Sequence, residues 1–325
     1  MGCSAWLEAL GTKRCAPEPI RAMLGPDGAV DPLPEPQARD WLAIHEEQGQ
    51  TFDEFVRTAA RVPAGERTIY LQPVDAAAAL SETCLATLAG FVTAFFQLDV
   101  RVRPPLVLDP ATLVTRAAPD HGTRQVYAGD ILARLFADKP QDAFCVLGIT
   151  AHDLFPHPIV SFAFGEASAA CRVAVVSVAR YGPPFCEDGP GRQPGEMRKR
   201  CCRVIAHEIG HMAGIGHCIY YSCLMNGSSS LAESDRRPLH LCPVDLRKLQ
   251  WLVGFDFAER YRRLGQFWRE ADDAAEAAWM AARDGRRPTS SRATHFAMMS
   301  MRSMRSHSRM RSSTSEPADT RPNTV

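Results

Sequence analysis

The sequence predicts a mixed α/β (α+β) fold in which a mixed, twisted sheet carries an antiparallel strand at one edge. Between residues 67 and 150, segments with strand character alternate with segments of helical spacing, and this order favours a sheet packed against helices. Residues 143–150 (AFCVLGIT) form a continuous apolar run, which is typical of a strand buried on both faces. Two further apolar segments, 160–164 and 173–179, flank a turn rich in Gly, Ser and Ala, which predicts an antiparallel pair at the sheet edge.

The elements before residue 143 follow from local composition. Residues 36–61 predict one or two short amphipathic helices, because Trp and Phe recur among polar residues. Residues 67–73 (RTIYLQP) are β-branched and aromatic and predict a strand. Residues 75–97 predict a helix, and residues 99–107 predict a strand region that two prolines interrupt. Residues 125–138 predict a second helix, because their apolar side chains keep helical spacing.

Two helices are predicted in the second half of the chain. Residues 198–213 predict a helix that carries several potential metal ligands, and a loop rich in Gly and Pro, 182–195, precedes it. Residues 249–268 keep apolar side chains at i, i+3 and i+4 intervals, which predicts a helix laid against the body of the domain.

The ends of the chain differ in composition from its middle. Residues 1–36 contain six prolines and predict a flexible leader, whereas residues 37–284 predict one folded domain. Residues 285–325 are rich in Arg, Ser and Met without periodicity and predict a disordered tail.

Charge and cysteine content limit the classes of function and the compartment. Without residues 285–325, the chain has 29 basic and 35 acidic residues, so we expect no nucleic-acid partner. The uncharged apolar run 83–98 has sixteen residues and is shorter than the ~20 that span a bilayer. Eleven cysteines without an export signal indicate a reducing compartment. We therefore expect an intracellular protein, cytoplasmic or also nuclear and not secreted, that acts as a monomer.

The segment HEIGHMAGIGH indicates a metal site at the end of the helix predicted over residues 198–213. His207 and His211 are four residues apart, which places both imidazoles on one face of a helix, one turn apart. Glu208 is rotated by about 100° from His207, beside the metal, where a base for metal-bound water belongs. Gly214 can end the helix in the left-handed conformation, so that His217 returns as a third ligand. Three imidazoles leave a fourth position open, as in catalytic zinc sites.

The residues after His217 extend this motif. Cys218 follows it directly, Cys223 and Met225 complete the pattern HExxHxxGxxHCx4CxM, and Cys242 lies in the segment LCPVDLRKL. Together with IYLQPV, CVLGIT, ARYG and RRPLHLCP, this pattern resembles the archaemetzincins over about residues 65–268.

The resemblance implies a metzincin-like fold with an upper part, about 65–213, and a lower part, about 214–284. It also implies two zinc ions as cofactors. His207, His211 and His217 would hold the catalytic zinc, and four cysteines would hold a structural one, Cys218, Cys223 and Cys242 among them. Met225 would be the Met-turn, an apolar floor beneath the histidines that acts by packing.

One position departs from the family pattern. Asp245 stands where the distal cysteine pair would have its second member. A carboxylate is a known zinc ligand, which would make Asp245 the fourth ligand of the second site. An acid in the first turn of a helix is also favourable without a metal. Water, or one of the thiols Cys201 and Cys202, could complete the site instead.

These features predict a zinc metallopeptidase that hydrolyses peptide bonds, aminopeptidase-like or acting on short peptides, with Glu208 as general base. Its partner would be a peptide or protein substrate, held along the edge strand near Phe164 or Val173. Two alternatives belong to other classes: a zinc-stabilised interaction module with little turnover, and an adaptor that binds through the Arg-rich tail.

Overall fold

A five-stranded mixed sheet organises the domain in the computed structural model, which describes residues 8–11, 16–23, 30–59, 61–75, 81–120, 122–181 and 195–284. The strand order is β2-β1-β5-β8-β7, in which β7 pairs antiparallel with β8 at one edge and the other neighbours are parallel. A second sheet has the order β3-β4-β6. The strands are β1 (Thr68–Pro73), β2 (Asp99–Val102), β3 (Thr115–Ala117), β4 (Arg124–Tyr127), β5 (Ala143–Thr150), β6 (Asp153–Phe155), β7 (Gly165–Ser168) and β8 (Val173–Ser177). The predicted mixed sheet with an antiparallel edge is confirmed.

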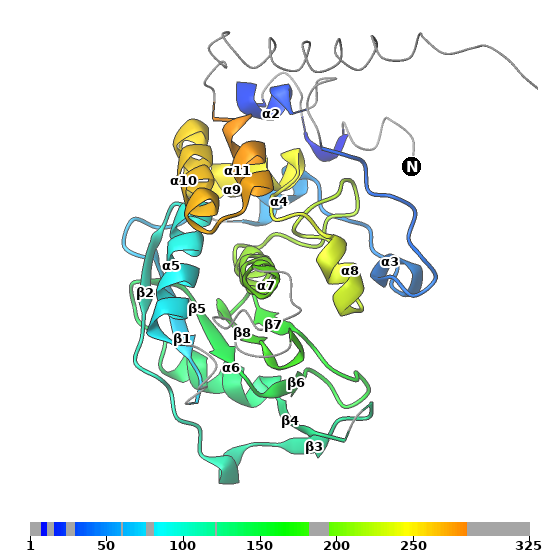
Figure 1. Cartoon of the computed structure of the whole chain (residues 1–325), viewed down its shortest axis with the longest axis vertical. Helices are drawn as coiled ribbons and strands as arrows, with labels where there is room; N and C mark the ends of the chain where they lie inside the picture. Colours follow the sequence, from blue (N-terminus) through cyan, green and yellow to red (C-terminus); the bar gives the residue numbers. More distant parts are fainter. Residues whose placement is uncertain are drawn as a thin grey trace, which may run out of the picture. The chain divides into compact units, whose positions relative to one another are not determined.

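Helices cover both faces of the large sheet (Figure 1). Helices α5 and α7 contact each other over one face, where α7 also contacts β5 and β8, and α6 packs on β5 and β8 from the other face. The helices are α2 (Glu18–Ala22), α3 (Trp41–Ile44), α4 (Phe52–Thr58), α5 (Glu82–Phe96), α6 (Ala128–Ala137), α7 (Glu196–Met212), α8 (Leu231–Arg236), α9 (Pro243–Val253), α10 (Phe257–Glu270) and α11 (Ala274–Ala281), with short 3₁₀ turns η2 (Pro110–Thr112) and η3 (Ala179–Tyr181).

The alternation of side chains along the central strands creates two cores. Ile69 and Leu71 of β1 belong to the large core with α5 and α7, whereas Tyr70 belongs to the smaller core with Ile131 and Leu135 of α6. All eight residues of β5 are buried, as the apolar run predicts. The sheet is thus a rigid base for α7, which carries the motif.

Three predicted elements have different bounds. Residues 160–164 do not form the strand expected there, because their apolar side chains line a cavity, and the edge strand is β7; Val173 lies on the inner strand β8. The helix expected from residue 125 starts at Ala128, after β4 has paired with β6. The stripe at 249–268 is divided between α9 and α10, because Gly254 adopts a left-handed conformation with φ of 82°.

The prediction that residues 1–36 form a flexible leader is wrong for part of that segment. Leu10 and Ile20 are fully buried in the large core, and α2 packs against α9. The six prolines predicted flexibility, but apolar residues before and between them pack against the rest of the domain, including α9. The predicted loop at 182–195, apart from Gly195, and the tail at 285–325 lie outside the described residues.

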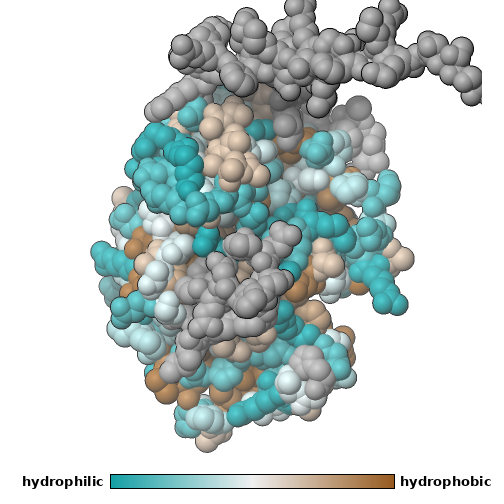
Figure 2. Space-filling view, in the orientation of Figure 1, coloured by the Kyte–Doolittle hydropathy of each residue, from teal (hydrophilic) through white to brown (hydrophobic). Residues whose placement is uncertain are grey.

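Within the described ranges, no helix has the length and apolar character needed to cross a membrane. Figure 2 shows one face of the molecule, on which hydrophilic residues intermingle with smaller apolar areas.

Candidate metal centre and catalytic cleft

Helix α7 presents His207 and His211 on one face, as the spacing predicts. The Nδ1 atom of His207 lies 3.0 Å from the carbonyl oxygen of Leu224, and that of His211 lies 2.9 Å from the carbonyl oxygen of Ile215. A carbonyl oxygen only accepts hydrogen bonds, so each Nδ1 carries the proton and each Nε2 keeps a free lone pair. Both imidazoles are therefore fixed in the tautomer that binds a metal through Nε2.

A glycine after α7 turns the chain so that the third histidine lies beside the other two. Gly214 has φ of 82°, the left-handed conformation predicted for it, and Ile215 N donates to Gly210 O at 3.0 Å across the helix end. His217 follows in the loop, where its Nδ1 lies 2.7 Å from Oε1 of Glu47. A carboxylate partner again leaves Nε2 as the free nitrogen.

The three imidazoles converge on one point. Their ligand atoms all lie within 4.8 Å of one another, and Nε2 of His207 is 3.0 Å from Nε2 of His211. Nitrogens at ~2.0–2.1 Å from a tetrahedral zinc would be roughly 3.3 Å apart, so the donor set fits this ion. Burial first, and then the neighbouring imidazoles, lower the pKa of His207 well below its usual range. Burial, followed by the charge of His217, lowers the pKa of His211 to about 4. Neutral imidazoles are the form that binds metal.

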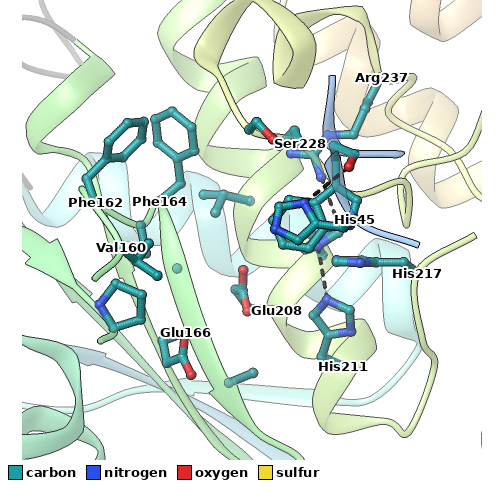
Figure 3. A pocket seen from close by; sticks show the side chains of 18 of the residues that line it. His45, Val160, Phe162, Phe164, Glu166, Glu208, His211, His217, Ser228 and Arg237 are labelled. Atoms are coloured by element: carbon teal, nitrogen blue, oxygen red, sulfur yellow. Dashed lines mark hydrogen bonds between the residues drawn. The ribbon is translucent and has the colours of Figure 1, made fainter. Parts of the chain in front are cut away.

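Glu208 faces a cavity of about 550 Å³ beside the histidines. Figure 3 shows Val160, Phe162 and Phe164 on one side of this cavity and the histidines on the other, with Glu208 between them. Burial raises the pKa of Glu208 to about 8, with a smaller contribution from Glu166. A carboxylate with a pKa near neutrality is suited to general base work.

The edge strand contacts Glu208 through a glycine. A Cβ added to Gly165 would lie 2.5 Å from Oε1 of Glu208, so a side chain at this position would displace the carboxylate. The next residue, Glu166, adds a second carboxylate to the cavity lining. Neither residue was predicted, because the expected strand ended at residue 164.

Arg237 closes the cavity from the loop side and was also missed. It donates from Nη1 to the carbonyl oxygen of Asn226 at 2.8 Å and from Nη2 to Oγ of Ser234 at 2.7 Å. The same Nη1 is 3.0 Å from Nδ1 of His207, a contact that is not a hydrogen bond when Nδ1 carries the proton, because both atoms are then donors. The charge of Arg237 is one of the causes that lower the pKa of that imidazole. The segment RRPLHLCP contained this arginine, but nothing in its spacing marked the contact.

Met225 lies under the helix between the two helical histidines. A Cβ on Gly210 would be 2.5 Å from its Sδ, so the thioether packs directly against the helix backbone there. Met225 is fully buried, and its carbonyl oxygen accepts from the backbone N–H of Cys218 at 2.9 Å. This packing supports the Met-turn expected at Met225, which stays a prediction.

A second cluster of potential ligands lies in the lower part of the domain. Cys218, Cys223, Cys242 and Asp245 are all buried, and their ligand atoms lie within 4.8 Å of one another. The Sγ atoms of Cys218 and Cys242 are 3.6 Å apart, and Oδ2 of Asp245 is 3.2 Å from Sγ of Cys223 and 3.8 Å from Sγ of Cys242. Ligands at ~2.0–2.3 Å from a tetrahedral zinc would be roughly 3.3–3.8 Å apart, so these distances fit.

The three thiols of the cluster differ in their pKa values. Burial, and then a hydrogen bond with Cys218, raises the pKa of Cys223 and of Cys242 well above the usual range. Burial disfavours the thiolate of Cys218, but hydrogen bonds from Cys223 and Cys242 lower its pKa well below the usual range. Cys201 and Cys202 are fully buried on α7 and do not belong to the cluster, and burial raises the pKa of each thiol. They pack in the core and do not supply the fourth ligand.

Asp245 divides its two oxygens between the thiols and a buried lysine. Its Oδ2 faces the thiols, whereas its Oδ1 accepts from Nζ of Lys248 at 2.8 Å. The side chains are 0% and 1% exposed, respectively. Burial raises the pKa of Asp245 to about 6, although Lys248 opposes this shift. Asp245 does lie in the first turn of α9, but its carboxylate is committed to these side chains.

Comparisons with known proteins point to one family. The profile of peptidase family M54 matches residues 122–251. The chain is 37% identical over 257 residues to archaemetzincin-2 of Macaca fascicularis, covering 69% of this chain and 71% of that protein. It is 36% identical over 254 residues to archaemetzincin-2 of Homo sapiens, with coverage of 69% and 71%. Among solved structures, archaemetzincin from Methanopyrus kandleri matches with 28% identity and a TM-score of 0.46, covering 60% of this chain and 99% of that one.

The sequence similarity extends over more than two thirds of these relatives, and the family profile covers the segment with both ligand clusters. The chain belongs to the archaemetzincin family, peptidase family M54, and is a zinc-dependent metallopeptidase.

Proposed function

We propose that the cleft between α7 and β7 hydrolyses peptide bonds with His207, His211 and His217 as the ligands of a catalytic zinc and Glu208 as the general base. The observation that carries this proposal is the convergence of three free Nε2 atoms beside a buried carboxylate in one cavity. An aminopeptidase-like enzyme or a peptidase of short peptides fits a cavity of about 550 Å³.

The chain's own residues would carry out the proton transfers. Zinc bound to the three imidazoles would supply a Lewis acid that polarises the scissile carbonyl group and acidifies the attacking water. Glu208 would take the proton of that water on its carboxylate and deliver it to the leaving amine. The outer edge of β7 would bind the substrate main chain by β-augmentation, which would place the scissile bond next to Glu208. Val160, Phe162 and Phe164 would receive an apolar side chain of the substrate.

A second zinc would have a structural role. We assign Cys218, Cys223, Cys242 and Asp245 as its ligands, because all four are buried away from the cavity that contains Glu208. A metal at this point would join the loop after α7 to the start of α9. Such a bond contributes to folding and would hold the loop that carries His217.

The wider organisation follows from the same residues. We propose that the catalytic domain comprises residues 37–284, with an upper part at 65–213 and a lower part at 214–284, together with the buried residues of 8–23 that pack on it. We also propose that the enzyme is an intracellular monomer. Seven described cysteines are free thiols, which supports a reducing compartment, and the disulfide at Cys84 is an exception to that pattern.

Hydrolysis by the purified protein tests this function. A panel of short peptides should be cleaved by the wild type and not after removal of the zinc by a chelator. Glu208→Gln should retain the zinc, because all three imidazoles remain, and should lose at least ~10²-fold in activity. Activity near the wild-type level in this variant would exclude Glu208 as the base. Zinc binding without hydrolysis of any peptide by the wild type would favour the interaction module.

A further inference from the structure

The segment formed by residues 30–50, here called the N-terminal strap, is fastened to the loop that carries His217. At its start, the carbonyl oxygen of Asp31 accepts from Ser222 N at 2.9 Å. At its end, Gln50 accepts from Gly216 N at 3.2 Å and donates to the carbonyl oxygen of Gly214 at 3.1 Å. The strap therefore contacts the backbone of this loop both before His217, at Gly214 and Gly216, and after it, at Ser222.

Trp41 is the fixed point in the middle of the strap. Its backbone N–H donates to Oε1 of Glu233 at 2.8 Å, and a Cβ on Gly227 would overlap its indole ring. The ring stacks on His45 with centroids 3.8 Å apart and meets the His217 ring edge-on at 5.3 Å. These contacts set the direction of the indole Nε1–H.

That N–H group is directed at a carboxylate. Trp41 Nε1 donates to Oε1 of Glu47 at 2.7 Å, and the same oxygen is 2.7 Å from Nδ1 of His217. Glu47 and His217 are only 22% and 20% exposed, so the pair is mostly shielded from water. The indole thus holds the Glu47 carboxylate where it can accept a hydrogen bond from Nδ1 of His217.

His217 differs in this respect from the other two histidines. The Nδ1 partners of His207 and His211 are neutral backbone carbonyl oxygens, whereas that of His217 is an ionisable side chain. A carboxylate on the far nitrogen of a metal-binding imidazole fixes the ring orientation and makes Nε2 a stronger donor. His217 also lies in a loop, where its own element constrains it less than a helix constrains the others.

We propose that Glu47 is the positioning residue of the third zinc ligand and that the N-terminal strap, through Trp41 and Glu47, sets how tightly the catalytic metal is held. This inference rests on the proposed role of His217 as a ligand. It gives a segment that precedes the first strand of the sheet a direct part in the metal centre.

Metal affinity measured on the full chain tests the proposal. Metal-free protein would be titrated with Co²⁺, because only the thiolate cluster gives sulfur-to-cobalt charge transfer and the d–d bands then report the imidazole site. Glu47→Ala should raise the dissociation constant of the imidazole site by about 10–100-fold and alter its d–d bands. Glu46→Ala, a change at the exposed neighbouring glutamate, should leave both unchanged.

Two further variants separate the carboxylate from the packing of the strap. Glu47→Gln keeps an oxygen acceptor but removes the charge, and should weaken binding less than Glu47→Ala. Trp41→Phe keeps a ring against Gly227 while it removes the Nε1–H donor, and should also weaken binding less than Glu47→Ala.

Wild-type affinity and spectrum in Glu47→Ala would overturn the proposal. A larger loss in Trp41→Phe than in Glu47→Ala would also overturn it, because the carboxylate would then matter less than the rest of the strap. If Glu47→Ala fails to fold, wild-type affinity in Glu47→Gln overturns it and weakened affinity in that variant supports it. His217→Ala distinguishes the underlying assignment, because undiminished metal binding there would refute His217 as a ligand whatever Glu47 does.

Discussion

Replacing Asp245 by alanine would separate the two interactions of a buried carboxylate. The side chain pairs with Lys248 through Oδ1 and faces three thiols through Oδ2. Removal of one member of a buried ion pair leaves the other charge uncompensated, which destabilises a protein by ~3–5 kcal/mol. At ~2–4 °C per kcal/mol, the melting temperature should fall by roughly 6–20 °C. If Asp245 is also a ligand, the second zinc should be lost as well.

Lys248→Met is the matched control, because it removes the same ion pair and leaves the carboxylate oxygens in place. Both variants should be less stable than the wild type, but only Asp245→Ala should change metal content. Metal analysis after dialysis should give two zinc equivalents for the wild type and Lys248→Met, and one for Asp245→Ala. Asp245→Cys, combined with Lys248→Met, should restore two, because thiolate is a softer donor that suits zinc.

Two retained equivalents in Asp245→Ala would refute the ligand assignment. The carboxylate would then act as the partner of Lys248 alone. One equivalent in the wild type, after purification with ample zinc, would refute the second site itself.

Other substitutions test the cleft and the acid sensitivity of the fold. Gly165→Ala should lower kcat by at least ~10-fold with the zinc content unchanged, because its Cβ would displace the Glu208 carboxylate. Gly90→Ala is the control and should keep full activity, because there is open space around Gly90. Equal activities of the two variants would refute the contact. His217→Ala should lose the catalytic zinc on dialysis that spares the thiolate site, and full retention would contradict the triad. Burial lowers the pKa of His240 to about 3, so the unfolded state takes up the proton first and stability falls as the pH drops from ~6.5 towards 3. Urea unfolding should show roughly 2 kcal/mol of this loss between pH 7 and 5, and His240→Phe should lack it; identical pH profiles would exclude His240 as the source.

The sequence predicts well where one local pattern determines the structure. The apolar run of β5 can only be buried, and its bounds agree with the prediction at both ends. The left-handed Gly214 and the two helical histidines follow from backbone sterics and helix periodicity, which act within a few residues. These are local effects, so a single sequence contains them.

The sequence predicts poorly where distant segments meet. Residues 160–164 have the apolar composition of a strand, but in the fold they line the cavity beside Glu208. Leu10 and Ile20 are ordinary apolar residues among prolines until the C-terminal helices give them a surface to cover. Glu47 is one of many acidic residues, and only the fold brings it to His217. The residues missed at the site are those whose partners lie far away along the chain.

The pairing of Glu47 with His217 has a consequence for the order of folding. The two residues are 170 positions apart, so the contact closes a very long loop and forms late. During synthesis at ~5–20 residues per second, the strap would wait roughly 10–35 seconds for its counterpart to be made. A ribosome-bound chain that stops short of His217 would already have the central sheet and no metal centre. Competence for hydrolysis would thus be acquired in one late step, when the loop that carries His217 meets the N-terminal strap.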